Sequence, residues 1–149
     1  MSEKEIDTGE LLDKVVKTTS ISRFIKRHGK SMEQVSFSSH ITGLCTAMNV
    51  LPAHVIEKSG IERTFGHQLF NGRRNPSRDK VIQLAVGFGM NYKEAQELLQ
   101  AARKSILYPK IKRDAVVIYA LENNLSFCDM QATLSELTLP LIGEEGDHG

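Results

Sequence analysis

Apolar residues along the chain recur mainly three and four positions apart, the spacing that places side chains on one face of an α-helix. The clearest case is Ile41, Leu44, Cys45 and Met48, which fall at i, i+3, i+4 and i+7. Runs that favour strands are scarce, and no internal repeat or low-complexity block interrupts the pattern. The sequence therefore predicts an all-α protein.

Five helices separated by short breaks are predicted in a central domain, residues 39–102. The first carries the stripe just described, and the third spans roughly Glu62 to Phe70. Proline is tolerated in the first turn of a helix, and glycine often follows the last turn, so these two residues help to place the boundaries. The breaks and helix starts are marked by Pro52, Gly60, Gly72, Pro76-Ser77 and the segment Asn91–Glu94. The apolar residues expected to face inward are Val55, Ile56, Val81, Leu84, Ala85, Phe88, Ala95, Leu98 and Leu99.

The second and third of these helices are joined by the short turn Ser59-Gly60-Ile61. Two helices connected by a tight turn that contains glycine form a helix-turn-helix unit, whose second helix fits the major groove of duplex DNA. A basic loop with a proline follows the third helix. This segment carries most of the functional prediction.

Shorter segments flank the central domain. Residues 1–38 read as a polar leader with two short helices, the first begun by a capping box at Asp7-Thr8-Gly9-Glu10 and the second capped by Ser20. The stretch Ser31 to Ser39 resembles a linker with a helix cap at its end.

After the central domain, residues 103–142 form a basic loop and two further helices, and residues 143–149 form an acidic tail that we expect to be disordered. The two C-terminal helices are expected either to cap the core or to form a homodimer interface. Their apolar residues are Val116, Val117, Tyr119, Phe127, Met130, Leu134 and Leu137.

The segment from Leu44 to Leu99 resembles the Cro/phage-repressor (XRE) family of bacterial helix-turn-helix regulators. The likeness covers about sixty residues and rests on the order and spacing of several short motifs, each weak by itself. They are Gly60-Ile61, Leu69, the run Asn71-Gly72-Arg73-Arg74-Asn75-Pro76-Ser77, Leu84-Ala85 and Gly89-Met90. More loosely, the whole chain is similar to small regulators of Firmicutes type. The resemblance implies a five-helix lambda-repressor-like domain and a transcription regulator that binds double-stranded DNA.

The family's geometry, carried over to this chain, assigns two sets of DNA contacts. Base reading from the recognition helix would fall to Arg63, Thr64, His67 and Gln68; arginine can donate two bonds to guanine, and glutamine can pair with adenine. Phosphate contacts would fall to Arg73, Arg74, Arg78 and Lys80, and these would add affinity and salt dependence without sequence information. The alternative is that both sets are simply solvated surface side chains.

Three residues depart from the family's pattern. Gly66 stands where the family buries an isoleucine or valine, so either Phe65 or Phe70 fills that space or the helix bends. Phe70 replaces a residue that is usually polar, and Pro52 replaces one that often bonds phosphate. These departures motivate a second hypothesis: a helical protein–protein adaptor or antitoxin-like module with Phe65, Gly66 and Phe70 on an apolar docking surface.

Charge is segregated along the chain although the net charge is only +1. Six cations and no acid lie from Lys14 to Lys30, and five more cations lie from Arg103 to Arg113. After Arg113 the sequence contains aspartate and glutamate but no lysine or arginine. Such segregation builds local fields even where the sum is small. The second run would either extend the DNA footprint or pair with the acidic C-terminal third, whereas the leader's cations favour a solvated face over a second DNA arm.

Composition and motifs argue against the other function classes. Hydrophobic residues make up 40% and charged residues 25%, which is typical of a globular domain. Cys45 and Cys128 are too few for a disulfide framework or zinc site and are expected to be buried, reduced thiols. The five histidines show no metal-ligand spacing, and nothing forms a catalytic triad or phosphate loop. We therefore expect a cytoplasmic, non-enzymatic protein without cofactor or metal and without a membrane association.

Overall fold

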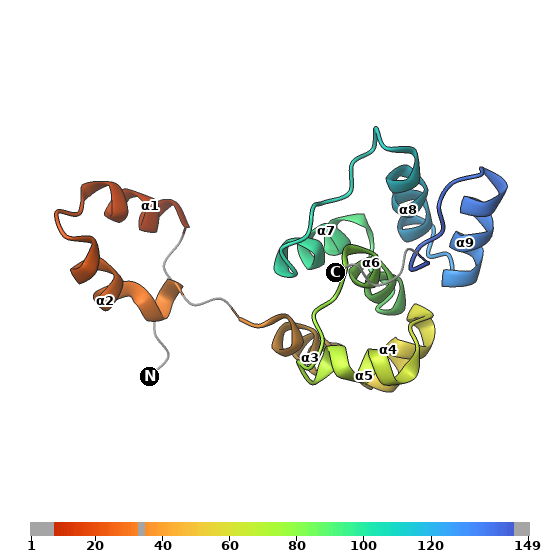
Figure 1. Cartoon of the computed structure of the whole chain (residues 1–149), viewed down its shortest axis with the longest axis horizontal. Helices are drawn as coiled ribbons and strands as arrows, with labels where there is room; N and C mark the ends of the chain where they lie inside the picture. Colours follow the sequence, from red (N-terminus) through yellow and green to blue (C-terminus); the bar gives the residue numbers. More distant parts are fainter. Residues whose placement is uncertain (1–7, 33–34, 145–149) are drawn as a thin grey trace. The chain divides into compact units, whose positions relative to one another are not determined.

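The computed structural model describes residues 8–32 and 35–144, and within these residues the chain is all-α, with nine helices and no strand (Figure 1). Contacts divide the chain into two compact units, residues 1–35 and residues 36–149. None of the helices in the described part combines the length and apolar character needed to cross a bilayer. The two units are described separately below.

The first unit is a pair of short helices, α1 (Thr8–Lys17) and α2 (Ile21–Met32). Ser20 caps α2 as predicted, because its hydroxyl accepts a hydrogen bond of 3.4 Å from the Arg23 amide. The side chain of Phe24 is buried, and its ring lies 4.7 Å from that of His28. Asp7, which the sequence placed in a capping box, lies outside the described residues.

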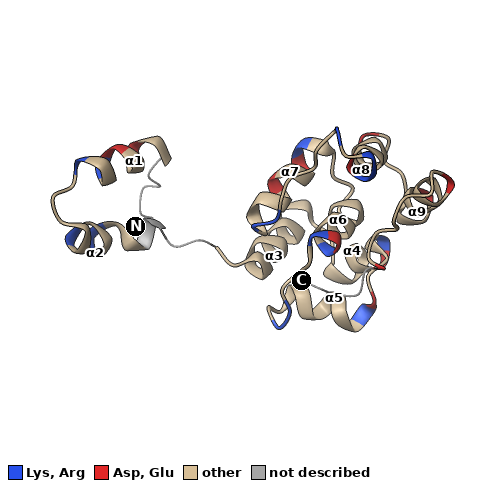
Figure 2. Ribbon diagram, turned by 45° about the horizontal axis from the view of Figure 1, so that its top comes forward, with Lys and Arg blue, Asp and Glu red and all other residues tan. Residues whose placement is uncertain are grey.

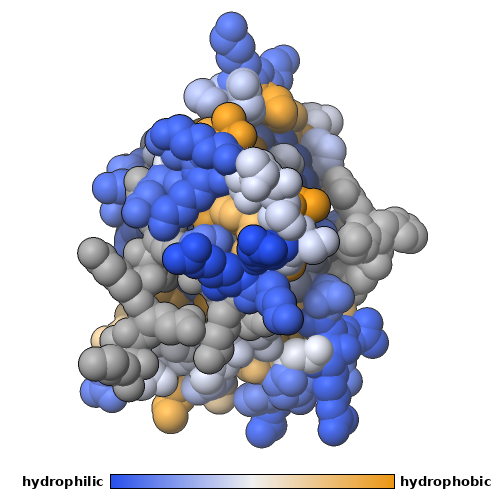
Figure 3. Space-filling model, turned by 90° about the vertical axis from the view of Figure 1, so that its left-hand side faces the viewer, coloured by the Kyte–Doolittle hydropathy of each residue, from blue (hydrophilic) through white to orange (hydrophobic). Residues whose placement is uncertain are grey.

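Much of the apolar surface of this first unit stays exposed. Leu12 and Val16 on α1 are 63% and 74% exposed, and Ile21 and Ile25 on α2 are also open to solvent. The view that faces the first unit shows hydrophobic atoms between strongly hydrophilic ones (Figure 3). Short helices of this kind gain little stability by themselves.

The second unit is built around α6 (Arg78–Gly87), most of whose residues are buried. Val81, Ile82, Leu84 and Ala85 are each at most 2% exposed. This helix packs against α4, α7, α8 and α9, so it presents apolar side chains on nearly every side rather than along one stripe (Figure 1). The surrounding helices are α3 (Phe37–Met48), α4 (Pro52–Ser59), α5 (Arg63–Phe70), α7 (Tyr92–Ala101), α8 (Lys112–Glu122) and α9 (Phe127–Glu136).

Most of the predicted helix boundaries are confirmed by capping geometry. Pro52 begins α4, and Gly60 ends it with a φ of 72° in the left-handed region. The Ser77 and Ser126 side chains cap α6 and α9. Asn91 caps α7 in a full capping box with Glu94. These local hydrogen bonds were readable from the sequence because each depends on residues only three positions apart.

The C-terminal helices α8 and α9 belong to the same hydrophobic core as the central helices. Val117, Met130 and Leu134 are fully buried in one cluster with residues of α6 and α7. Tyr119 and Leu137, which share the predicted apolar stripe, are instead 56% and 58% exposed. One face of α8 and α9 therefore caps the core and leaves a second apolar face outside.

Three expectations about local structure are corrected, namely the linker, the burial of Cys128 and the start of the C-terminal tail. The segment Ser31 to Ser39 is not a linker throughout, because α2 extends to Met32 and α3 already begins at Phe37, capped by Ser36. Cys128 is exposed rather than buried, whereas Cys45 is buried and burial raises the pKa of its thiol.

The start of the predicted acidic tail is also ordered. Ile142 is buried, and the Gly143 amide donates a hydrogen bond of 2.9 Å to Asp79. The remainder of that tail, residues 145–149, lies outside the described residues.

Candidate nucleic-acid interface

The turn between α4 and α5 is held by a fully buried serine. The hydroxyl of Ser59 donates to the Ile56 carbonyl at 2.6 Å and accepts from the Ile61 amide at 3.3 Å. Its own carbonyl accepts a hydrogen bond of 3.2 Å from Gln83 on α6. At Gly60 a Cβ would overlap the ring of Phe127, so α9 closes over this turn. The angle between α4 and α5 is thereby fixed by Ser59 at the end of α4 and by side chains from two other helices, α6 and α9.

Glu62 caps the start of α5 with its side chain. Its carboxylate accepts hydrogen bonds from the amides of Thr64 at 3.0 Å and Phe65 at 2.8 Å. Those amide hydrogen bonds, aided by the charge of Arg74, lower the pKa of Glu62 below its ordinary value. A negative charge at a helix N-terminus also interacts favourably with the helix dipole.

Gly66 lets α5 lie directly on α4. A Cβ at Gly66 would lie 2.5 Å from Cγ2 of Ile56, which is itself buried. The space that the family fills with a branched side chain from this position is therefore filled from the other helix. Neither Phe65 nor Phe70 occupies it, which corrects that part of the sequence interpretation.

The opposite face of α5 carries three of the four predicted base-reading residues. Arg63, Thr64 and His67 are exposed on it, whereas Gln68 is half-buried. The Gln68 side-chain oxygen accepts a hydrogen bond of 2.8 Å from Nε of Arg74. That amide still has its NH₂ group for a further contact, and its orientation is tied to the arginine.

Arg74 and Lys80 gather around Phe65. The Arg74 guanidinium lies 4.8 Å and the Lys80 ammonium 5.3 Å from the centre of the Phe65 ring. Contacts of this kind hold a cation over an aromatic face while part of it stays solvated. Arg73 is exposed in the same loop, and its amide donates to the Asn71 side chain at 3.0 Å. Basic residues thus lie at both ends of α5 (Figure 2).

Arg78 has a different environment from the other three predicted phosphate contacts. Its guanidinium donates to both carboxylate oxygens of Asp114, at 3.1 and 2.8 Å, and to the carbonyls of Ser105 and Ile106 at 2.9 and 3.0 Å. These hydrogen bonds use the donors that a phosphate contact would need. The Arg78 side chain therefore links α6 to α8 and is not part of the basic surface around α5.

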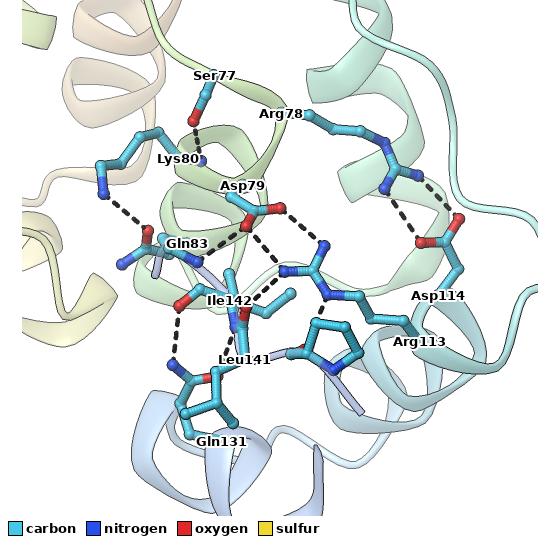
Figure 4. A network of polar contacts seen from close by, with 12 residues as sticks. Ser77, Arg78, Asp79, Lys80, Gln83, Arg113, Asp114, Gln131, Leu141 and Ile142 are labelled. Carbon is cyan, nitrogen blue, oxygen red and sulfur yellow. Dashed lines mark hydrogen bonds and ion pairs between the residues drawn. The ribbon is translucent and has the colours of Figure 1, made fainter. Parts of the chain in front are cut away.

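A second ion pair mirrors the first (Figure 4). Arg113 of α8 donates to both oxygens of Asp79 on α6, at 3.0 and 2.8 Å. Burial opposes the ionisation of Asp79, but the hydrogen bonds from Arg113 and the Gly143 amide, with the charges of Arg113 and Arg78, outweigh it and lower its pKa. The acidic partner of Arg113 lies on α6 and not in the acidic C-terminal third. Arg113 contacts that third through backbone carbonyls instead, because its guanidinium also donates to Pro140 at 2.9 Å and to Leu141 at 2.6 Å.

These paired residues were missed by the sequence interpretation. The only signal was the repetition of an Arg-Asp dipeptide, Arg78-Asp79 and Arg113-Asp114, in the first turns of two helices. The aromatic contact at Phe65 was missed as well, since its two cations come from different segments. Among the described residues no group of three acidic, histidine or cysteine side chains could hold a metal ion.

No protein-family model, no curated protein and no solved structure matches this chain significantly.

Proposed function

We propose that α3 to α7 form a helix-turn-helix domain of the Cro/phage-repressor type and that the protein is a sequence-specific regulator of transcription. In this proposal it acts in the cytoplasm on double-stranded DNA, without a cofactor or a catalytic step. The observation that carries the proposal is the two-sided construction of α5. Its inner side lies on Ile56 through Gly66, and its outer side presents Arg63, Thr64 and His67 to solvent.

Such a helix suits the major groove, where arginine reads guanine through two hydrogen bonds. Arg63 lies at the start of α5 on the base-reading face, and the cations placed for the DNA backbone, Arg73, Arg74 and Lys80, follow the end of the helix. In this assignment Gln68 reads a base while Arg74 holds its side chain in position. Arg78 leaves the set of phosphate contacts and stabilises the domain instead.

The test is binding to random duplex DNA, measured by fluorescence anisotropy between about 50 and 300 mM salt. Replacing Arg73 and Arg74 by alanine should reduce the slope of log affinity against log salt by about two. A matched control, Lys26→Gln with Lys93→Gln, removes two exposed cations outside the interface and should leave the slope nearly unchanged.

Specificity is tested separately. Arg63→Ala should remove most of the preference for the chain's own upstream region over random DNA, because a bidentate base contact contributes about 1–3 kcal/mol. The salt slope should change by about one unit at most, since only one cation is lost. Absence of binding to any duplex by the unaltered chain would reject the proposal.

A second candidate, a protein-binding module, is favoured by one observation. Leu51 is 73% exposed beside a shallow apolar cleft of about 410 Å³, lined also by Pro52, Ala53 and Phe70. Apolar side chains here suit a protein partner better than a phosphate backbone. The surface first envisaged for this role is different, because Gly66 is buried and Phe65 lies beneath Arg74 and Lys80. Loss of partner binding in Leu51→Asp, with no DNA binding in the unaltered chain, would favour this candidate.

A further inference from the structure

Four of the six cations found from Lys14 to Lys30 line one cleft between α1 and α2. Lys14 and Lys17 come from α1, Arg23 and Arg27 come from α2, and the connecting residues Thr18–Ser20 complete the rim. The cleft has a volume of about 350 Å³, and none of its lining residues is acidic. A solvated basic face, which the sequence favoured, would spread these charges over a convex surface. The structure instead brings them together in a concavity.

The convergence follows from the local sequence. Arg23 and Arg27 are four residues apart on α2, and Lys14 and Lys17 are three apart on α1, so each pair shares a helix face. The buried ring of Phe24 also lines the cleft. In the turn, the Thr18 hydroxyl donates to the Ser20 carbonyl at 3.2 Å and accepts from the Ser20 amide at 3.4 Å. The two basic faces are thereby turned toward the same space.

The charges in this cleft are only slightly compensated by neighbouring acids. Lys14 lies 3.7 Å from Glu10 in an exposed i,i+4 pair, which screens weakly. Four cations around one concavity repel one another, and an anion bound among them removes that repulsion. Guanidinium groups donate in a fork that matches phosphate oxygens, while lysines add point charge. The hydroxyl groups of Thr19 and Ser20 on the rim supply further donors, whereas that of Thr18 already donates to the Ser20 carbonyl.

We propose that the cleft between α1 and α2 binds a phosphate group. If the protein binds DNA as proposed, the phosphate group comes from the DNA backbone. The choice of this phosphate source therefore rests on the proposed function. In the DNA-bound protein the first unit then contributes its own phosphate contacts in addition to those around α5. A free phosphate ion offers the same chemistry, and the experiment separates the two sources.

The experiment uses the full chain and inorganic phosphate as the first probe. Amide signals of Thr18, Thr19 and Ser20 are followed by ¹H–¹⁵N NMR while phosphate replaces chloride at constant ionic strength. We expect saturable shifts confined to the first unit. The variant Arg23→Gln with Arg27→Gln should weaken phosphate binding by about tenfold or more, because two charge-assisted hydrogen bonds are lost.

The matched control is again Lys26→Gln with Lys93→Gln, whose side chains are exposed and do not line the cleft. The control should bind phosphate as the unaltered chain does. Equal weakening in both variants, or no saturable shift in the unaltered chain, would overturn the proposal, since general charge would then explain any effect. Circular dichroism of the variant excludes loss of α2 as the cause.

The second arm repeats the DNA salt series with the same two variants. A salt slope reduced by about two in the cleft variant, but not in the control, assigns the site to the DNA backbone. Loss of phosphate binding with an unchanged DNA slope assigns it to free phosphate. If the unaltered chain binds no duplex while phosphate still shifts the turn signals, the proposed function fails and the phosphate site stands.

Discussion

Gly66 of α5 lies against Ile56 of α4 so closely that a single added methyl group has no room. The nearest atoms of Ile56 would be 2.5 and 2.8 Å from a Cβ at this position, well inside ordinary contact distance. Ile56 is 2% exposed, so its side chain has little freedom to move away. The contact between Gly66 and Ile56 therefore determines the distance between α5 and α4.

Gly66→Ala should destabilise the protein even though alanine favours a helix. The propensity gain is about 0.5–1 kcal/mol, and overpacking in a core costs about 1–3 kcal/mol. We expect a net loss of about 1–2 kcal/mol in urea unfolding. The control is Gly43→Ala on α3, where nothing lies within 4 Å of an added Cβ, and this variant should be stabilised. Stabilisation of both variants would show that the contact between Gly66 and Ile56 leaves room for an added methyl group.

Asp114→Ala should be among the more damaging substitutions outside the apolar core. The Asp114 side chain is 3% exposed and that of Arg78 is 25% exposed, with their closest atoms 2.8 Å apart. Removing one partner of such a pair leaves a partly buried charge, at a cost of about 3 kcal/mol. Glu10→Gln breaks the exposed pair with Lys14 and should cost less than about 0.5 kcal/mol. Similar small losses in both variants would contradict a structural role for the inner pair.

Stability should fall in acid partly through Asp79. Its folded-state pKa is lowered, so the unfolded chain takes up a proton at higher pH than the folded chain does. The stabilisation is present above the ordinary aspartate pKa of about 3.9 and is lost as the pH falls through the lower folded-state value. Urea unfolding between about pH 6 and pH 2 should therefore show a shallower acid decline in Asp79→Asn than in the unaltered chain. If the free energy of unfolding falls equally with pH in the two proteins, Asp79 does not contribute to the loss of stability in acid.

The boundaries of most helices could be predicted from the sequence, because they depend on interactions over three or four residues. Ser77 and Asn91 cap the helices that their positions indicated. The exposed face of α5 was also predictable, since Arg63, Thr64 and His67 follow from helical periodicity once Glu62 is placed at its start. Periodicity is a local property, and it was sufficient for these residues.

Contacts between distant segments were not predictable in the same way. Arg78 looked like a surface cation because its partner Asp114 lies thirty-six positions away, and Asp79 and Arg113 are thirty-four positions apart. The role of Gly66 depends on a branched side chain ten residues earlier, and a single sequence does not indicate how helices pack across one another. The phosphate cleft of the first unit likewise arises only when α1 and α2 are brought together.

The outer apolar face of α8 and α9 should mediate dimer formation. Tyr119 and Leu137 lie there beside a cleft of about 510 Å³ that Val116 and Leu139 also line. We expect Tyr119→Ser with Leu137→Ser to convert a dimer to a monomer in sedimentation velocity, since apolar area is lost from one continuous patch. Leu51→Ser removes a still more exposed apolar side chain, at the N-cap of α4, and should remain dimeric. A monomeric unaltered chain at all concentrations would rule out this interface.

Glu62 should oppose DNA binding while it supports α5. Its carboxylate caps the helix next to the cationic face, so a nearby phosphate backbone is repelled by the same charge that holds the Thr64 and Phe65 amides. Glu62→Gln keeps an oxygen acceptor and removes the charge, and it should therefore bind duplex DNA severalfold more tightly at low salt. Because exposed charges are screened, this gain should shrink as salt rises. Glu62→Ala also removes the cap and should gain less, because the first turn of α5 then frays. Anisotropy at two salt concentrations measures both effects, and weaker binding by Glu62→Gln would show that the charge contributes more to positioning α5 than to repelling DNA.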